Sequence, residues 1–140
     1  MQTSKWGPPG WEFLHSIAHN YPLEPTVQDR INYKLFYEHL QNMLPCKYCR
    51  ESYSRFIKEI PIDSYLSCRE GVITWVYLIH NLVNDKLRDQ GYPLSRNPTL
   101  KRVVQKYDRW RAKCGKVPGK IGGSCRIPVI SKSISRRIAP

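Results

Sequence analysis

Acidic residues are missing from the last fifth of this 140-residue sequence. All eleven Asp and Glu precede Cys114, whereas residues 114–140 hold six basic residues among several glycines and serines. We therefore expect one domain at residues 1–113 and a flexible basic tail at 114–140. One interpretation of the tail is an arm for nucleic acid or another polyanion, and the other is a solubilising extension. The tail has no aromatic residue for base stacking, which favours the second.

Long apolar runs are also missing. The longest apolar stretch, near residues 72–79, is too short to cross a bilayer, and the first residues lack the apolar core of a secretion signal. We expect no membrane contact and, by default, a cytoplasmic protein. A persistent disulfide in that compartment is usually catalytic rather than structural.

Internal repeats are absent, and alternation of the strand type is rare. The apolar residues instead recur at helical spacing, which predicts an all-α fold. We expect a four-helix bundle with a short fifth helix lying across it. Ser67 is the expected N-cap of the fourth helix, with Glu70 as its capping-box partner, and Gly91 is its expected C-terminal cap. The expected helices follow Pro8-Pro9-Gly10 up to Tyr21 and span about 26–43, 46–60, 67–90 and 98–113.

A second cysteine pair is missing as well, and this matters for the motif Cys46-Lys47-Tyr48-Cys49. Two cysteines in the first turn of a helix can close a disulfide, and the helix dipole favours a thiolate at Cys46. A zinc site would need a further ligand pair at matching spacing, but Cys68, Cys114 and Cys125 are isolated. A redox pair, half of a zinc site and two unrelated buried thiols are the three interpretations. Because strand–helix–strand units of a thioredoxin-like fold are not evident, a redox pair here needs a cofactor as its electron partner.

Two helical faces combine aromatic and polar side chains. Trp11 and His15 are four residues apart, as are His80 and Asn84, with Asn81 beside them. Asparagine is a poor helix former, so two of them near one histidine suggest a hydrogen-bonding role. A flavin would match this set, because tryptophan can stack on it and Asn or His can bond its edges. For either histidine alone, a hydrogen-bonded core residue is the simpler interpretation. His15 and His19 lack a nearby carboxylate on their face, so we expect no metal site.

Five separated motifs resemble the Erv/ALR family of sulfhydryl oxidases, in the order in which that family carries them. They cover roughly residues 5–113, and the compact chain is similar to the small virus-encoded members. In sequence order they are Trp6-Gly7, Trp11-x-x-Leu14-His15, Cys46-x-x-Cys49, His80-Asn81-x-Val83-Asn84 and Asp108-Arg109-Trp110.

This resemblance implies a helical bundle that binds FAD without a covalent bond, usually as a homodimer. It implies that Cys46 meets the substrate thiol and that Cys49 lies nearest the isoalloxazine ring. By position, Lys86 would lie near phosphate and Trp110 would stack on the adenine. The full set of residues that the resemblance assigns to the cofactor is Trp6, Gly7, Trp11, His15, Tyr21, Cys49, His80, Asn81, Asn84, Lys86 and Trp110.

The sequence departs from the family pattern in three places. Pro8 stands where many members have an arginine, residues 87–97 lack a stapling cysteine, and no cysteine precedes Cys46 to act as a shuttle. Cys114 and Cys125 flank a glycine-rich part of the tail. They form either a shuttle disulfide that passes electrons to Cys46 or an incidental pair of thiols, and Cys68 is expected to be a packed thiol.

We therefore predict an FAD-dependent thiol oxidase that makes disulfide bonds and passes electrons to O2, releasing hydrogen peroxide. Its expected partners are thiol-containing protein substrates or a thioredoxin-like carrier, with the host cytoplasm or the virion as its location if it is virus-encoded. The alternative is a zinc-containing basic helical module that binds nucleic acid, which the net charge of +12 would suit.

Overall fold

The computed structural model describes residues 1–111, and within that range it contains helices and no strand. This confirms the all-α prediction. The chain divides into two compact units, residues 1–97 and a second unit that begins at Pro98. The first unit holds α1 (Thr3–His19), α2 (Val27–Met43), α3 (Lys47–Glu59), the short 3₁₀ helix η1 (Ile62–Tyr65) and α4 (Arg69–Asp89), and the second holds α5 (Leu100–Asp108).

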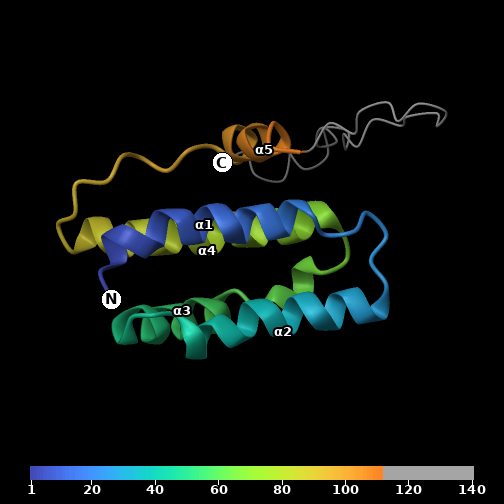
Figure 1. Cartoon of the computed structure of the whole chain (residues 1–140), viewed down its shortest axis with the longest axis horizontal. Helices are drawn as coiled ribbons and strands as arrows, with labels where there is room; N and C mark the ends of the chain where they lie inside the picture. The colour runs from blue at the N-terminus through green and yellow to red at the C-terminus, as the bar shows by residue number, and fades with distance from the viewer. Residues whose placement is uncertain (112–140) are drawn as a thin grey trace. The chain divides into compact units, whose positions relative to one another are not determined.

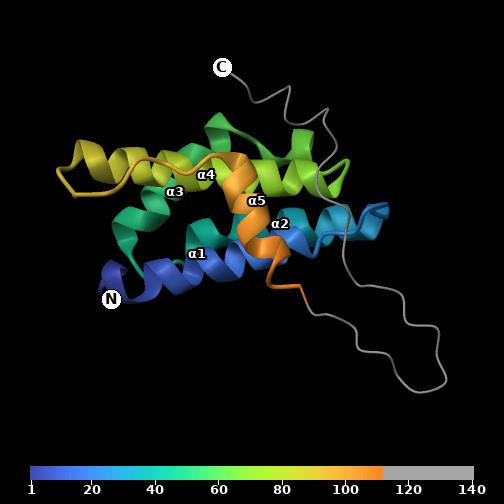
Figure 2. The same ribbon diagram turned by 90° about the horizontal axis from the view of Figure 1, so that it is seen from above.

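The four long helices of the first unit form the predicted bundle. α1 packs along α4, α2 packs along α3, and α3 also contacts α4, as the two views in Figures 1 and 2 show. The 3₁₀ helix η1 packs on α4 as well. Because α4 contacts three other elements, it is the central helix of the unit.

Buried apolar side chains of α4 supply much of the core. Val72, Trp75, Val76 and Ile79 are almost completely removed from solvent. The indole N–H of Trp75 donates to the carbonyl of Ile60 over 2.8 Å, so its one polar atom is paired. Burial of such side chains is the main favourable term in folding, at roughly 25 cal/mol per Å² of apolar surface.

Buried tyrosines tie the helices together through backbone carbonyls. The hydroxyl of Tyr37 donates to the carbonyl of Leu14, and the hydroxyl of Tyr53 donates to the carbonyl of Tyr37, at 2.9 and 2.8 Å. Burial raises the pKa of Tyr53 far above its usual range, which keeps the phenol protonated as a donor. These bonds satisfy polar groups that would otherwise be costly inside the bundle.

Two predicted helix starts are wrong. Pro8 and Pro9 lie inside α1, which begins at Thr3 rather than after Gly10. The amides that these prolines lack would have bonded the carbonyls of Ser4 and Lys5, which belong to exposed residues and can bond water instead. The N-cap of α4 is Cys68 rather than Ser67, and its side chain makes no capping hydrogen bond.

The capping box lies instead at the start of α2. The Thr26 hydroxyl accepts from the backbone amide of Asp29 at 3.1 Å, and the Asp29 carboxylate accepts from the backbone amide of Thr26 at 2.9 Å. The predicted C-terminal cap at Gly91 is consistent with its positive φ of 85°, which glycine adopts without strain. The fifth helix is shorter than predicted, with Thr99 as its N-cap.

No helix of residues 1–111 combines the length and the apolar character that crossing a membrane requires. The predicted basic tail at 114–140, the boundary at 113/114 and the pair Cys114 and Cys125 lie outside the described residues.

Candidate redox site

The two cysteines of the motif lie at the start of α3. Cys46 is the N-cap, and its sulfur accepts a hydrogen bond from the backbone amide of Cys49 at 3.3 Å. Both cysteines are free thiols and half-buried. Tyr48, between them, is 73% exposed, so molecules in solution can reach this turn.

The pKa values of the two thiols are displaced in opposite directions. A hydrogen bond from the Cys49 side chain, helped by the backbone amides of Cys49 and Tyr48, lowers the pKa of Cys46 below its ordinary value. Burial, followed by the hydrogen bond to Cys46, raises the pKa of Cys49. The site therefore favours the thiolate form of Cys46. A thiolate is the form in which a cysteine attacks or leaves in thiol–disulfide exchange.

The first turn of α1 lies against the turn that holds Cys46 and Cys49, here called the redox turn. The Thr3 hydroxyl is 4.0 Å from the sulfur of Cys49, and the N-terminal ammonium donates to the carbonyl of Pro45 over 3.3 Å. One turn further along α1, the indole N–H of Trp6 is buried without a hydrogen-bond partner. A buried N–H group normally has a hydrogen-bond acceptor, but no atom of residues 1–111 accepts from this one.

The aromatic and imidazole residues predicted to bind a cofactor come together between α1 and α4. The rings of Trp11 and His80 stack with centroids 4.0 Å apart and planes 7° from parallel. His15 is buried, and its Nε2 lies 3.0 Å from Nδ1 of His80. The structure thus assembles three of the predicted residues from two helices into one cluster.

The remaining predicted residues are distributed more widely. Asn81 and Gly7 are half-buried on α4 and α1. The side chain of Asn84 donates to Asn97 at 3.1 Å. Trp110 belongs to the second unit, where it is 51% exposed and lies edge-on to Tyr107.

Tyr21 is fully buried and serves the fold. Its hydroxyl donates to the carbonyl of Leu66 at 2.8 Å, and its ring packs edge-on against Tyr33. It lies fifteen residues after Trp6, about 20 Å along the direction of α1. Its assignment to the cofactor stays a prediction that its surroundings do little to support.

Lys86 reaches from α4 to α3. Its ammonium donates to the hydroxyl of Ser52 at 2.6 Å, and its charge lowers the pKa of Cys49, as the weakest of the influences on that thiol. Sequence reasoning missed both Ser52 and Thr3. The spacing of three residues from Cys49 to Ser52 was an available signal, because residues three apart on a helix are neighbours.

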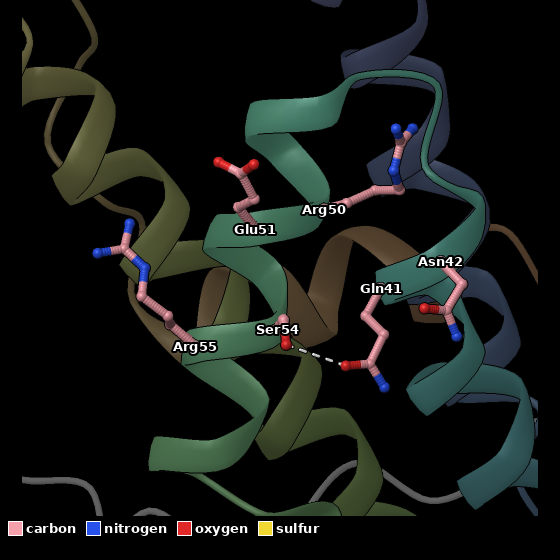
Figure 3. Close-up of a pocket in the computed structure, with 6 residues that line it drawn as sticks. All are labelled: Gln41, Asn42, Arg50, Glu51, Ser54 and Arg55. Atoms are coloured by element: carbon pink, nitrogen blue, oxygen red, sulfur yellow. Dashed lines mark hydrogen bonds between the residues drawn. The ribbon is translucent and has the colours of Figure 1, made fainter.

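A pocket of about 640 Å³ lies between the end of α2 and α3, and Figure 3 shows its lining. Ser54 donates to Gln41 across it, while Arg50 donates to the carbonyl of Leu44. The pocket contains none of the residues predicted to bind the cofactor. Its lining consists of Gln41, Asn42, Arg50, Glu51, Ser54 and Arg55.

Residues 1–111 contain no cluster of potential metal ligands. No three His, Cys, Asp or Glu side chains there are grouped so that they could hold an ion. The zinc-containing alternative therefore lacks a ligand set in this part of the chain.

A model of the Erv1/Alr family matches residues 9–108. A probable FAD-linked sulfhydryl oxidase of Acanthamoeba polyphaga mimivirus is 39% identical over 85 residues, which is 60% of this chain and 59% of the relative. The mitochondrial FAD-linked sulfhydryl oxidase of Saccharomyces cerevisiae is 34% identical over 82 residues, or 59% of this chain and 42% of the relative. The matched part of the chain thus spans less than two thirds of either relative.

Solved structures of the yeast protein have the same helical architecture. The crystal structure of the yeast Erv1 core superposes with a TM-score of 0.68 at 26% identity, covering 76% of this chain and 84% of the other. The FAD-binding domain of yeast Erv1 gives a TM-score of 0.68 at 27% identity, covering 76% and 94%.

Proposed function

Because this chain belongs to the Erv1/Alr family, we propose that it is an FAD-dependent thiol oxidase with Cys46 and Cys49 as its redox-active pair. The observation that carries the proposal is the first turn of α3. There the half-buried sulfur of the N-cap Cys46 accepts a hydrogen bond from the amide of a second half-buried cysteine three residues later. Because the pKa of Cys46 is lowered and that of Cys49 is raised, the two thiols suit different roles in the exchange.

The chemistry begins with the two cysteines joined as a disulfide. A substrate thiolate attacks the sulfur of Cys46, the Cys46–Cys49 bond breaks, and Cys49 leaves as a thiolate. A second substrate thiolate attacks the substrate sulfur of this mixed disulfide. It forms the substrate disulfide and releases Cys46 as a thiolate, whose low pKa makes it a good leaving group. The two cysteines are now reduced and carry the electron pair taken from the substrate.

FAD would accept that electron pair and transfer it to O2, giving hydrogen peroxide. Residues of α1 and α4 fit such a group, because Trp6 offers a buried N–H that lacks an acceptor, and Trp11, His15 and His80 form an aromatic cluster with ring nitrogens. We propose that they hold the cofactor together with Gly7, Asn81, Asn84 and Lys86. For Trp110, in the second unit, contact with the adenine remains a prediction from the family resemblance. Cys49, half-buried and 4.0 Å from the Thr3 hydroxyl of α1, would be the thiol nearest to it.

Oxygen consumption tests this proposal. The purified protein should consume O2 and release an equal amount of hydrogen peroxide when dithiothreitol is added. Cys49→Ser should abolish both, because the electron pair can no longer leave the substrate through this thiol. A Cys49→Ser protein that keeps its flavin and still turns over at the normal rate would refute the role of the pair.

We further propose that the protein is a homodimer that oxidises thiol-containing proteins. The homodimer is supported by an exposed apolar stripe on α2. Its residues Val27, Ile31 and Leu35 are four positions apart and are 74%, 45% and 46% exposed. An exposed apolar row on one helix face is typical of a protein interface. Ile31→Lys should shift the mass measured by sedimentation towards the monomer, whereas Tyr92→Lys, which alters an exposed apolar residue beyond α4, should not.

A further inference from the structure

Ser52 is a buried polar residue in the helix that carries the redox pair. It is only 5% exposed. Its hydroxyl donates to the carbonyl of Tyr48 at 2.8 Å and accepts from the ammonium of Lys86 at 2.6 Å. The first bond anchors the hydroxyl to the residue just before Cys49. The second brings a cation from α4 to that turn.

Ser52 also lies next to Cys49 on the surface of α3. Residues three apart on a helix have Cβ atoms about 5–6 Å apart. A cation bonded to the Ser52 hydroxyl is therefore near the sulfur of Cys49, in agreement with the lowering effect of Lys86 on the pKa of that thiol. Burial raises the pKa of Cys49 most, and the other groups that act on this thiol are Cys46, the N-cap of α3, and Thr3 from α1.

Carboxylates lie near Lys86, but among the described residues its ammonium bonds a hydroxyl group instead. A groove between α3 and α4 is lined by Lys86 together with Glu59, Asp85 and Asp89. The ammonium nevertheless bonds the neutral hydroxyl of Ser52 and forms no ion pair with a described carboxylate. The ammonium is thus held at the Ser52 hydroxyl, one helical turn from Cys49, rather than at a carboxylate of the groove.

We propose that Ser52 is a positioning residue that holds the Lys86 ammonium beside Cys49 and so stabilises the Cys49 thiolate. Within the proposed function, that thiolate is the group released when a substrate thiol attacks Cys46. The inference rests on the proposed function only for this role, since the electrostatic effect needs neither flavin nor oxygen.

The test follows alkylation of Cys49 in the full-length protein. In a Cys46→Ser background, the rate of reaction of Cys49 with iodoacetamide is measured against pH by peptide mass spectrometry. Ser52→Ala should move the alkylation midpoint to higher pH and slow the reaction near neutral pH about two- to fivefold, the range expected for a partly exposed charge pair. Lys86→Met should have an effect at least as large, and the double variant should be no slower than Lys86→Met alone.

Ser54→Ala is the matched control. It removes a hydroxyl from the same helix, but one that bonds Gln41 of α2 instead of Lys86. Its alkylation profile should equal that of the parent. Ser52→Thr, which keeps the hydroxyl, should preserve the parent profile and guards against a folding defect in Ser52→Ala.

Three outcomes overturn the inference. They are a Ser52→Ala profile equal to that of Ser54→Ala, a Lys86→Met profile equal to the parent, and independent, additive effects of the two changes. Oxygen consumption by the protein with Cys46 intact separates this failure from failure of the proposed function. An active oxidase with an unchanged Cys49 profile refutes only the role of Ser52, whereas a shifted profile in a protein without oxidase activity supports that role and refutes the oxidase.

Discussion

The first turns of α3 and α4 start alike and end differently. Each has a cysteine with extended backbone at its N-cap, Cys46 at φ −146° and Cys68 at φ −157°. The sulfur of Cys46 accepts a hydrogen bond from the amide three residues later, but the side chain of Cys68 caps nothing. The residue three positions on is a second thiol in α3 and a glycine, Gly71, in α4.

Packing explains why the two turns diverge. A Cβ atom at Gly71 would collide with the carbonyl oxygen of Tyr65, so the start of α4 packs closely against η1. The turn of α3 instead keeps Tyr48 exposed beside its cysteines. A helix N-terminus alone therefore does not make a cysteine a redox centre. Within the proposed function the turn must also hold a partner thiol, which in α3 is Cys49.

Exchanging the two N-cap cysteines for serine should give the largest contrast. Cys46→Ser should lower the turnover of dithiothreitol by more than about a hundredfold, because the attacked sulfur is gone. Cys68→Ser should remain within about twofold of the parent, since serine is a favourable N-cap and no step uses this thiol. Oxygen-electrode assays of the two variants make the comparison. Equal losses would remove the distinction between the turns.

Substitution at Gly71 should break the packing side of the comparison. Gly71→Ala should reduce the free energy of unfolding by about 1–3 kcal/mol, because the new methyl group meets a backbone carbonyl that cannot move aside easily. Urea denaturation measures the loss. Gly10→Ala is the control, as its methyl would meet only the Trp6 ring at 3.6 Å and should leave stability equal or higher. Similar losses for both would contradict the close approach of η1 to α4.

A third helix start shows what a full capping box adds. Thr26→Ala should cost about 1 kcal/mol of unfolding free energy, because the Thr26 hydroxyl caps α2. Ser67→Ala should change stability by less than about 0.5 kcal/mol, since Ser67 is an exposed residue that caps no helix. Thermal unfolding of the two variants decides, and a larger effect at Ser67 would restore the capping box that the sequence predicts there.

Alkylation of the reduced protein should give the smallest contrast, a preference of a few-fold. The lowered pKa of Cys46 means that its thiolate is present at a lower pH than that of Cys49, whose pKa is raised. Below the ordinary thiol pKa, iodoacetamide should therefore label Cys46 first, and Cys49 should follow as the pH rises. Peptide mass spectrometry at a series of pH values reads the order, and labelling of Cys49 before Cys46 would invert the proposed roles.

Helix type and the redox motif could be predicted from the sequence, because apolar spacing and Cys-x-x-Cys are local patterns. The start of α1 could not be predicted from the sequence. Proline normally breaks a helix, but the carbonyls of Ser4 and Lys5, which lose their partners here, belong to exposed residues. The contact of Lys86 with Ser52 spans 34 positions of the chain and exists only because α3 packs on α4. Likewise, Thr3 meets Cys49 through the packing of α1 against the redox turn, which no local pattern encodes.

The most direct test of the account is the visible absorption spectrum of the purified protein before and after anaerobic addition of dithiothreitol. We predict a flavin spectrum that bleaches when the thiol is added and returns when air is admitted, because the proposed function passes electrons through Cys46 and Cys49 to FAD and then to O2. A protein that is colourless and stays so after incubation with FAD, or a bound flavin that the thiol does not bleach, would contradict the central claim.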